Sequence, residues 1–449
     1  MSTGLENQLF RNLFGTEAMR AIFSTYGTLR SWLRVEKALA QAQGELGVIP
    51  ADAAAAIAIA CDADDYDIDA IEAEICSTLH PLVPIVRAIV KKTEGAGAQW
   101  VHWGATTQDI IDTGAVLQMR DGLDLILADL KSATAALAGK AGQWRAVPMA
   151  GRTHAQHALP ITAGYKVAIW LDELGRVVAS LEVARNSLPG QLAGAVGTMA
   201  SLGDDAARVR QAYCQVLGLV DPVVPWHTSR DHIRKVCHAL IDLSVSVERI
   251  GQEVIRLQAT ELGEMSEPIS PQHVGSSTMP QKRNPHRAEC MVSGARMMRA
   301  QAEQCIGAGV HAFERDMSIW PVEWIALPDA FVLAAGLAAN LSVLAQGLTI
   351  NPERMAENLA LSGGQIMLES VMMKLGRQIG HEAAHDLLWR CVSRFQKEGG
   401  SFTDILRSST DLMQHLGEAE LATALEWSDY LGETEAIIGR VLAQNAATS

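Results

Sequence analysis

Apolar residues recur along most of this chain at spacings of three and four, which is the period of a helix with one buried face. The clearest example follows a possible cap at Thr228-Ser229 and comprises Ile233, Val236, Leu240, Ile241, Leu243, Val247, Ile250, Val254 and Leu257. A helix of this length suits the core of a bundle or an oligomer interface. The ranges 132–144, 161–185 and 323–346 have similar patterns, whereas runs of alternating β-branched residues are scarce. We therefore predict an all-α fold.

Two stretches of small or turn-forming residues suggest where domains begin and end. The first is Glu94–Ala98, and the second runs from Gly347 to Pro352. Glycine and proline in such stretches interrupt helices. We therefore predict three helical domains: an N-terminal domain over 1–101, a central domain of long helices over 102–350 and a C-terminal domain over 351–449.

Composition narrows the class of protein. The 449 residues are 48% hydrophobic and 20% charged, which allows a sizeable core. The net charge of −14 argues against a nucleic-acid partner, although a local cluster of cations could still bind an anionic substrate. Seven cysteines without a C-x-x-C pair, and an N-terminus without an apolar signal core, predict a reduced, cytoplasmic protein. The apolar stretch 329–348 contains Asn340 and Gln346, so we expect a buried helix and no membrane span.

The segment from Gly275 to Pro285 carries the most concentrated chemistry. Pro268, Pro271, Pro280 and Pro285 in and before it predict a loop between two helices, because proline lacks a backbone donor and disfavours helix in its predecessor. This loop combines hydroxyls with a lysine, an arginine and an amide. A candidate base beside fixed cations is what proton removal from an anionic substrate requires.

Three further clusters allow more than one interpretation. His154 and His157 could bind a metal, transfer protons or satisfy helix-end carbonyls, and a third ligand with a carboxylate cluster does not follow nearby. The stretch His102–Asp109 could hold a carboxylate at a helix start or could be an ordinary cap with Asp109 in the first turn. The small residues of Gly190–Thr198 could admit a ligand, but we favour tight packing of helices.

Taken together, these motifs resemble the fumarase/aspartase superfamily. The segment 275–285 matches its signature G-S-S-x-M-P-x-K-x-N-P at every specified position. Thr106–Asp109 resembles the first motif, T-S-x-D, and Gly151–His154 resembles G-R-T-H of the adenylosuccinate lyase branch. The resemblance extends over roughly residues 20–390. It implies a homotetramer with a core of about twenty helices, in which each active site takes its motifs from three subunits. It implies neither a metal nor another cofactor.

The resemblance also assigns roles to residues. Ser277 matches the general base, with Ser276 beside it, and His154 matches the general acid, with Glu289 as its carboxylate partner. The residues that match substrate contacts, or belong to the matching motifs, are Thr106, Thr107, Gln108, Arg152, Thr153, Met279, Lys282 and Asn284. His80 resembles a further active-site histidine of the adenylosuccinate lyase branch, although its flanking residues differ from the usual H-D. Arg315 and Ser318 resemble that branch's E-R-D-x-S stretch.

The expected activity is that of a C–N lyase, which splits an N-substituted aspartate into fumarate and an amine. Adenylosuccinate is the first candidate substrate and an iminodisuccinate the second. The alternative is a 3-carboxy-cis,cis-muconate cycloisomerase. That branch usually has tryptophan at the position of His154, yet Trp320–Trp324 and Gly363–Glu369 look closer to the cycloisomerases. We rank the histidine higher because it bears directly on the chemistry.

Two interpretations from other classes stay open. His381, Glu382 and His385 fit the H-E-x-x-H pattern of zinc hydrolases. A family member can also lose activity and persist as a structural protein. Our expectation is instead an enzyme that binds an anionic dicarboxylate and associates with neither nucleic acid nor a membrane.

Overall fold

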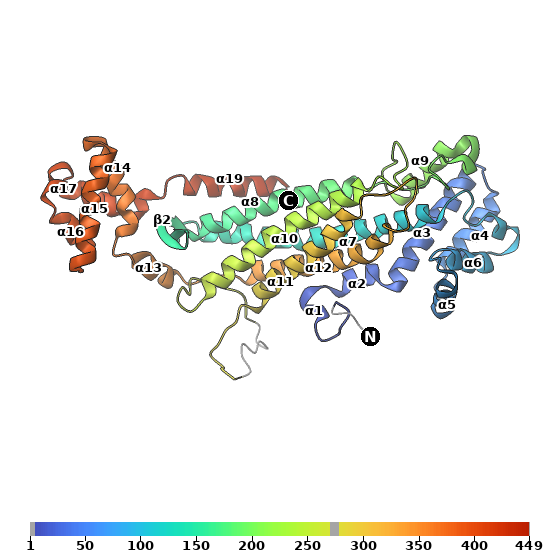
Figure 1. Ribbon diagram of the computed structural model, residues 1–449, viewed down its shortest axis with the longest axis horizontal. Helices are drawn as coiled ribbons and strands as arrows, with labels where there is room; N and C mark the ends of the chain where they lie inside the picture. The colour runs from blue at the N-terminus through green and yellow to red at the C-terminus, as the bar shows by residue number, and fades with distance from the viewer. Residues whose placement is uncertain (1–4, 270–277, 449) are drawn as a thin grey trace. The chain divides into compact units, whose positions relative to one another are not determined.

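The computed structural model describes residues 5–269 and 278–448, and helices dominate this part of the chain (Figure 1). The predicted all-α class is therefore correct. The described strands are short. They pair as two antiparallel ribbons, β1 (Pro148–Thr153) with β2 (Gln156–Thr162), and β3 (Met265–Ser266) with β4 (Thr349–Ile350).

Five long helices dominate the described chain. They are α7 (Thr107–Gln143), α8 (Ala163–Asn186), α10 (Asp231–Gln258), α11 (His286–Gly307) and α12 (Pro321–Gly347). The helical periodicity in the sequence predicted α8, α10, α12 and the end of α7, but not α11. The apolar positions given above for α10 are buried except Ile241, which is partly buried, as its three-and-four spacing leads one to expect. In α12, 72% of the most apolar window is buried. It is the one described helix whose length and composition would let it cross a membrane, and its burial fits the predicted core helix.

The chain divides into two compact units. The first unit comprises 1–130, 177–248 and 290–339, and the second comprises 131–176, 249–289 and 340–449. Each long helix contributes residues to both units. The three-domain division expected from the sequence stays a prediction, as does the tetramer with its twenty-helix core.

The first unit contains the N-terminal helices and a helix between α8 and α10. They are α1 (Arg11–Phe14), α2 (Glu17–Phe23), α3 (Thr25–Glu45), α4 (Ala51–Asp62), α5 (Ile68–Thr78), α6 (Val83–Lys92) and α9 (Ala206–Leu217), with short 3₁₀ turns η1 (Gly95–Trp100) and η2 (Ala200–Asp205). Side-chain oxygens cap the starts of α2, α3 and α5 from Thr16, Ser24 and Asp67. Buried residues of α3, α7 and α9 share one apolar cluster, which includes Val35, Leu39, Leu117 and Tyr213. This packing fixes the first turns of α7.

The second unit contains the hairpin β1–β2 and the C-terminal helices. They are α13 (Pro352–Ala360), α14 (Leu368–Ile379), α15 (His381–Glu398), α16 (Phe402–Arg407), α17 (Thr410–His415), α18 (Glu418–Leu425) and α19 (Thr434–Thr448), with η3 (Gln365–Met367) and η4 (Trp427–Tyr430). Helices α14 to α18 enclose a core of their own, built around Val371, Leu375, Phe402 and Leu412. A second small cluster packs Ala150 of β1 against Leu359 and Ile366, which anchors the hairpin to this unit.

Candidate active site

The first turn of α7 is held by the carboxylate of Asp109. Its Oδ2 accepts the backbone N–H of Thr106 at 3.0 Å, and its own N–H donates to the Thr106 carbonyl at 2.9 Å. This reciprocal pair satisfies donors that a helix start leaves without partners. The interpretation of Asp109 as part of a helix cap is therefore correct. Whether Thr106 and Thr107 also hold a substrate carboxylate stays a prediction.

The same carboxylate binds a second segment and a histidine. Oδ1 accepts the N–H of Ala193 at 3.0 Å and lies 2.9 Å from Nε2 of His227, while Oδ2 also accepts the N–H of Gly194 at 3.0 Å. Asp109 is completely buried. Three backbone N–H groups and a histidine ring thus surround a buried carboxylate, and hydrogen bonds to a charged group are stronger than those between neutral groups.

The glycine-rich segment 190–198 is a loop along α7. Besides the bonds to Asp109, the Gln191 N–H donates to Thr113 Oγ1 at 2.9 Å, and that hydroxyl donates to the Gln191 carbonyl at 3.0 Å. Our preference for tight helix packing in this segment was therefore wrong. Small residues serve here to bring one backbone close to the start of a helix.

Gln108 and Arg315, two predicted site residues from distant segments, are joined by a hydrogen bond. The Gln108 side chain donates to the His227 carbonyl at 2.8 Å, and its Oε1 accepts from Nε of Arg315 at 2.9 Å. Arg315 also donates through Nη2 to the carbonyl of Ala195 at 3.1 Å. Both acceptors of Arg315 are neutral, so these contacts orient its guanidinium without cancelling its charge.

His80 lies beside the same helix start. Its Nδ1 accepts the Val83 N–H at 3.2 Å, and its Nε2 lies 3.4 Å from Oγ1 of Thr107. An accepting Nδ1 leaves the proton on Nε2 in the neutral ring, directed at the threonine hydroxyl.

Ser318 lies in the loop before α12, where it binds Asp316. The N–H and the hydroxyl of Ser318 donate to Asp316 Oδ1 at 2.9 and 2.6 Å, and the Ala312 N–H donates to Oδ2 at 3.1 Å. The hydrogen bonds from Ser318, with help from Ala312, lower the pKa of Asp316. The carboxylate thus shapes the loop that carries Arg315 and Ser318.

In the second unit, His154 occupies the turn of the β1–β2 hairpin. Thr153 pairs with Gln156, so His154 and Ala155 form a two-residue turn, with φ of +51° and +62°. Such turns favour Asn-Gly, because residues with a Cβ are strained at positive φ. A histidine held in this strained conformation, exposed at the tip of a hairpin, suggests a functional constraint. Of the alternatives left open by the sequence, a role at helix-end carbonyls does not fit, because His154 lies in the hairpin turn and His157 on β2.

Arg152 is held by a buried carboxylate at the hairpin. Its Nη1 and Nη2 donate to the two oxygens of Glu264 at 2.9 and 2.6 Å, and Glu264 also accepts from Asn358 Nδ2 at 2.8 Å. Glu264 is fully buried. This bidentate pair orients the strand that leads to His154. The predicted substrate contact of Arg152 stays a prediction. In the structure, its guanidinium binds Glu264 of the same chain.

The signature loop is described only in part. Ser276 and Ser277 lie outside the described residues, whereas Thr278, Met279 and Lys282 are exposed. Asn284 Nδ2 lies 3.5 Å from His286 Nε2, and His286 Nδ1 lies 3.2 Å from Glu289 Oε2 at the start of α11. The predicted pairing of Glu289 with His154 stays a prediction.

The predicted site residues thus fall into two sets. The first unit holds His80, Thr106, Thr107, Gln108, Arg315 and Ser318, and the second unit holds Arg152, Thr153, His154, Met279, Lys282, Asn284 and Glu289. The contacts described above connect four members of the first set, namely His80 with Thr107 and Gln108 with Arg315.

A buried ion cluster next to the first set escaped sequence analysis. Arg230 is 1% exposed and donates to both oxygens of Asp112 and to both oxygens of Glu323. Burial alone would lower the pKa of Arg230, but the two carboxylates outweigh it and raise the pKa. His227 binds Asp109, and Arg230, three residues later, binds Asp112, which also follows Asp109 by three residues. This shared spacing of three residues is the sequence signal that could have revealed the cluster.

Comparison with known proteins decides the family. The family model described as "Lyase" matches residues 14–299, and the model "Adenylosuccinate lyase C-terminus" matches residues 364–441. The chain belongs to the fumarase/aspartase superfamily. It falls in the branch of the adenylosuccinate lyases and the 3-carboxy-cis,cis-muconate cycloisomerases, and it is an enzyme of the lyase class.

Individual relatives in this superfamily carry different activities. The chain is 37% identical to N-acetyl-S-(2-succino)cysteine lyase of Enterococcus italicus, over 97% of this chain and 96% of the relative. It is also 37% identical to 3-carboxy-cis,cis-muconate cycloisomerase of Pseudomonas aeruginosa, over 100% and 98%. The crystal structure of a fumarate lyase from Mesorhizobium sp. BNC1 matches with a TM-score of 0.89 at 36% identity, over 96% of this chain and 98% of that one.

The H-E-x-x-H pattern lies on the first turns of α15, inside the match to the adenylosuccinate lyase C-terminus. His381, Glu382 and His385 are all exposed. Over the described ranges 5–269 and 278–448, groups of three or more side chains that could hold a metal are not found. The match to the adenylosuccinate lyase C-terminus accounts for the presence of this helix.

We predict that Asp109→Asn destabilises the first unit by about 2–4 kcal/mol, because the amide cannot accept from all four donors and opposes some of them with its own N–H groups. Thermal unfolding of the variant measures the loss. Asp129→Asn on the same helix is the control. Burial raises the pKa of Asp129, so its ionised form is disfavoured in the fold and its removal should cost nothing. An unchanged melting temperature for Asp109→Asn would contradict this account.

Proposed function

We propose that this enzyme is a C–N lyase that removes fumarate from an N-substituted aspartate by β-elimination. The observation that carries the proposal is His154, which is exposed on a strained hairpin turn and matches the C–N lyases at this position. Departure of an amine requires a proton on nitrogen, and a histidine can supply it near neutral pH.

Proton removal is assigned to Ser277. Taking a proton from the carbon beside a carboxylate produces a carbanion, whose charge spreads into that carboxylate as an aci-acid dianion. Lys282, which is exposed, and Asn284 are assigned to the carboxylates of the substrate. Groups that bind the dianion better than the substrate lower the barrier. Serine is a weak base at its ordinary pKa, so closure of a cationic, water-poor site has to activate it.

The complete site is proposed to form between subunits of a homotetramer. The first set of residues then supplies hydroxyls, the Gln108 amide and Arg315, while the second set supplies His154 and the signature loop. Glu289 is assigned to His154 across a subunit boundary. We propose a cytoplasmic enzyme that needs no metal or other cofactor for this chemistry.

The relatives named as lyases support elimination from a substituted succinate as the reaction type, but they do not share one leaving group. One relative's name places the succino group on a cysteine sulfur. Adenylosuccinate and iminodisuccinate keep the nitrogen leaving group that we favour. The second candidate function is 3-carboxy-cis,cis-muconate cycloisomerisation. It is favoured by the cycloisomerase of Pseudomonas aeruginosa, which has the same 37% identity to this chain as the succinocysteine lyase, and by the tryptophan-rich stretch Trp320–Trp324.

The substrate panel is the first test. The purified protein is incubated with adenylosuccinate, iminodisuccinate, N-acetyl-S-(2-succino)cysteine and 3-carboxy-cis,cis-muconate, and fumarate and lactone are measured separately. We expect fumarate from at least one of the two N-substituted aspartates. Lactone alone would establish the cycloisomerase. Fumarate from the thioether alone would replace nitrogen with sulfur as the leaving atom. No product from a folded protein would revive the inactive paralogue.

The assignment of the base predicts that Ser277→Ala lowers kcat at least about 100-fold, because general-base catalysis contributes about that much. KM should change little, since the hydroxyl acts mainly in the transition state. Gln281→Ala is the matched control. It changes an exposed residue of the same loop at a position that the signature leaves unspecified. Unchanged turnover in Ser277→Ala removes this serine as the base.

The assignment of the acid predicts that the effect of His154→Gln depends on the leaving group. With two accepted substrates whose amines differ in basicity, the variant should lose most activity on the substrate with the more basic amine, because that amine depends most on protonation. The ratio of the two kcat/KM losses is the measurement. Equal losses would show that His154 orients the substrate without donating a proton.

A further inference from the structure

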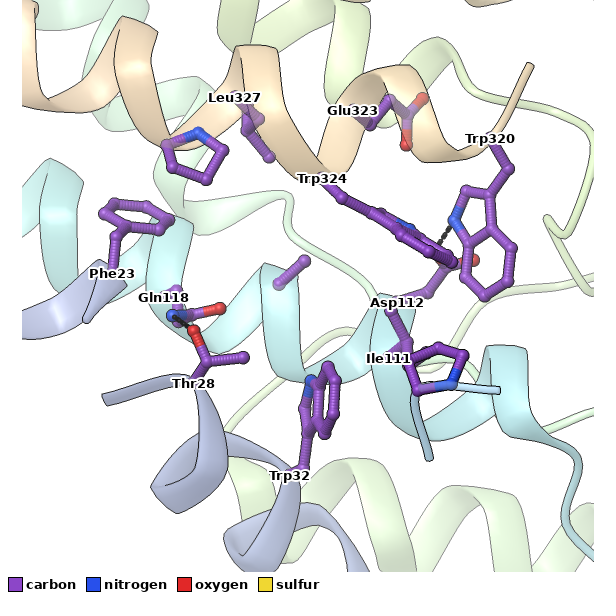
Figure 2. Close-up of a pocket in the computed structure, with 13 residues that line it drawn as sticks. Phe23, Thr28, Trp32, Ile111, Asp112, Gln118, Trp320, Glu323, Trp324 and Leu327 are labelled. Atoms are coloured by element: carbon purple, nitrogen blue, oxygen red, sulfur yellow. Dashed lines mark hydrogen bonds between the residues drawn. The ribbon is translucent and has the colours of Figure 1, made fainter. Parts of the chain in front are cut away.

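A cavity of about 210 Å³ lies within the first unit, beside the buried ion cluster. Figure 2 shows four aromatic side chains around it: Phe23 from α2, Trp32 from α3, Trp320 immediately before α12, and Trp324 from its first turn. The rings of Trp320 and Trp324 meet edge to face, with centroids 4.9 Å apart and an interplanar angle of 79°. Three indoles and a phenyl ring thus contribute much of the lining, and aromatic rings can attract a cation through their faces.

The wall of this cavity also carries excess negative charge. Asp112 and Glu323 both line it, and they share one guanidinium, Arg230, which does not line it. Two carboxylates and one guanidinium leave a net charge of −1 when all are ionised. Burial is the main reason why the pKa of Glu323 is raised, followed in the same direction by the charge of Asp112 and opposed by Arg230.

A nearby histidine does not supply the missing positive charge. His311 interacts electrostatically with Asp112 and with Arg230, and burial, followed by the charge of Arg230, lowers its pKa. This lowering favours the neutral ring. No lysine or arginine is found among the residues that line the cavity.

The cavity wall further contains a hydrogen-bond donor with no acceptor. The indole N–H of Trp320 donates to Asp112 Oδ1 at 3.0 Å. The buried indole N–H of Trp324, by contrast, has no hydrogen-bond acceptor within the described structure. A buried donor without a partner is destabilising, because it has lost its hydrogen bonds to water. An acceptor on a bound molecule would satisfy it.

We propose that this cavity is a binding site for a small organic cation, an alkylated ammonium that carries a hydroxyl or ether oxygen. Aromatic faces attract such a cation, and the excess carboxylate charge balances it. An alkylated ammonium is weakly hydrated, so it enters apolar walls at a lower cost than a small inorganic ion. Its oxygen can accept from Trp324. The inference is independent of the proposed lyase activity, because it uses none of the assigned catalytic residues.

Choline is the probe, and 3,3-dimethylbutan-1-ol is its uncharged counterpart of the same shape. Isothermal titration of the full-length protein should give a choline affinity at least about tenfold higher than that of the alcohol, from cation–π attraction and the uncompensated carboxylate. Equal affinities would overturn the proposal in favour of a plain apolar cavity. Absence of choline binding to the folded protein would overturn it outright.

Substitutions in the cavity wall test whether choline binds in this cavity. Trp324→Leu keeps an apolar wall and removes the ring and its N–H, so choline affinity should fall about tenfold while the alcohol binds as before. Glu323→Gln should weaken choline through loss of the excess charge, and Trp32→Leu provides a second aromatic test if Glu323→Gln does not fold. Leu327→Met, which changes a non-aromatic wall residue at nearly constant volume, should leave choline binding unchanged. Unaltered choline binding in both tryptophan variants would place choline elsewhere and refute the assignment.

Discussion

The buried carboxylate of Asp109 is the interaction on which the first half of the site depends. It binds the N–H groups of Thr106, Ala193 and Gly194, together with the His227 ring, and so joins three segments that are far apart in sequence. An ion without water is stable only when such donors replace its hydration. The helix start, the glycine-rich loop and the residues before α10 therefore cannot shift independently. One turn further along α7, Asp112 repeats the arrangement with Arg230 and Glu323.

The long helices could be predicted from the sequence because their apolar periodicity is local and continues for many turns. The hairpin that carries His154 could not be predicted, because its two-residue turn is His-Ala and lacks the Asn-Gly preference that marks such turns. Tertiary contacts around the hairpin, including the bidentate bond from Arg152 to Glu264, hold a conformation that its own sequence does not favour.

The ion cluster could not be predicted for a different reason, because its members are far apart in the sequence. Arg230 lies 118 residues from Asp112 and 93 from Glu323, and nothing local marks either carboxylate as buried. The prediction for residues 190–198 was wrong for a related reason. Small residues allow a helix and a loop to approach another segment equally closely. The motif residues themselves were found because their spacing matches a family signature. Their contacts, such as that of Gln108 with Arg315, required the structure.

The structure distinguishes the two arginines predicted to contact substrate. Arg152 already donates two hydrogen bonds to a fully buried carboxylate, and release of that pair would leave the charge of Glu264 without compensation, which is costly. Arg315 is held by an amide oxygen and a backbone carbonyl, and no carboxylate pairs with it in the described ranges. Its orientation is fixed while its charge remains uncompensated, which is the arrangement that electrostatic preorganisation for an anionic substrate requires. Of the two predicted contacts, the geometry therefore favours that of Arg315 with a dicarboxylate, whereas the position of Arg152 supports the hairpin that carries His154.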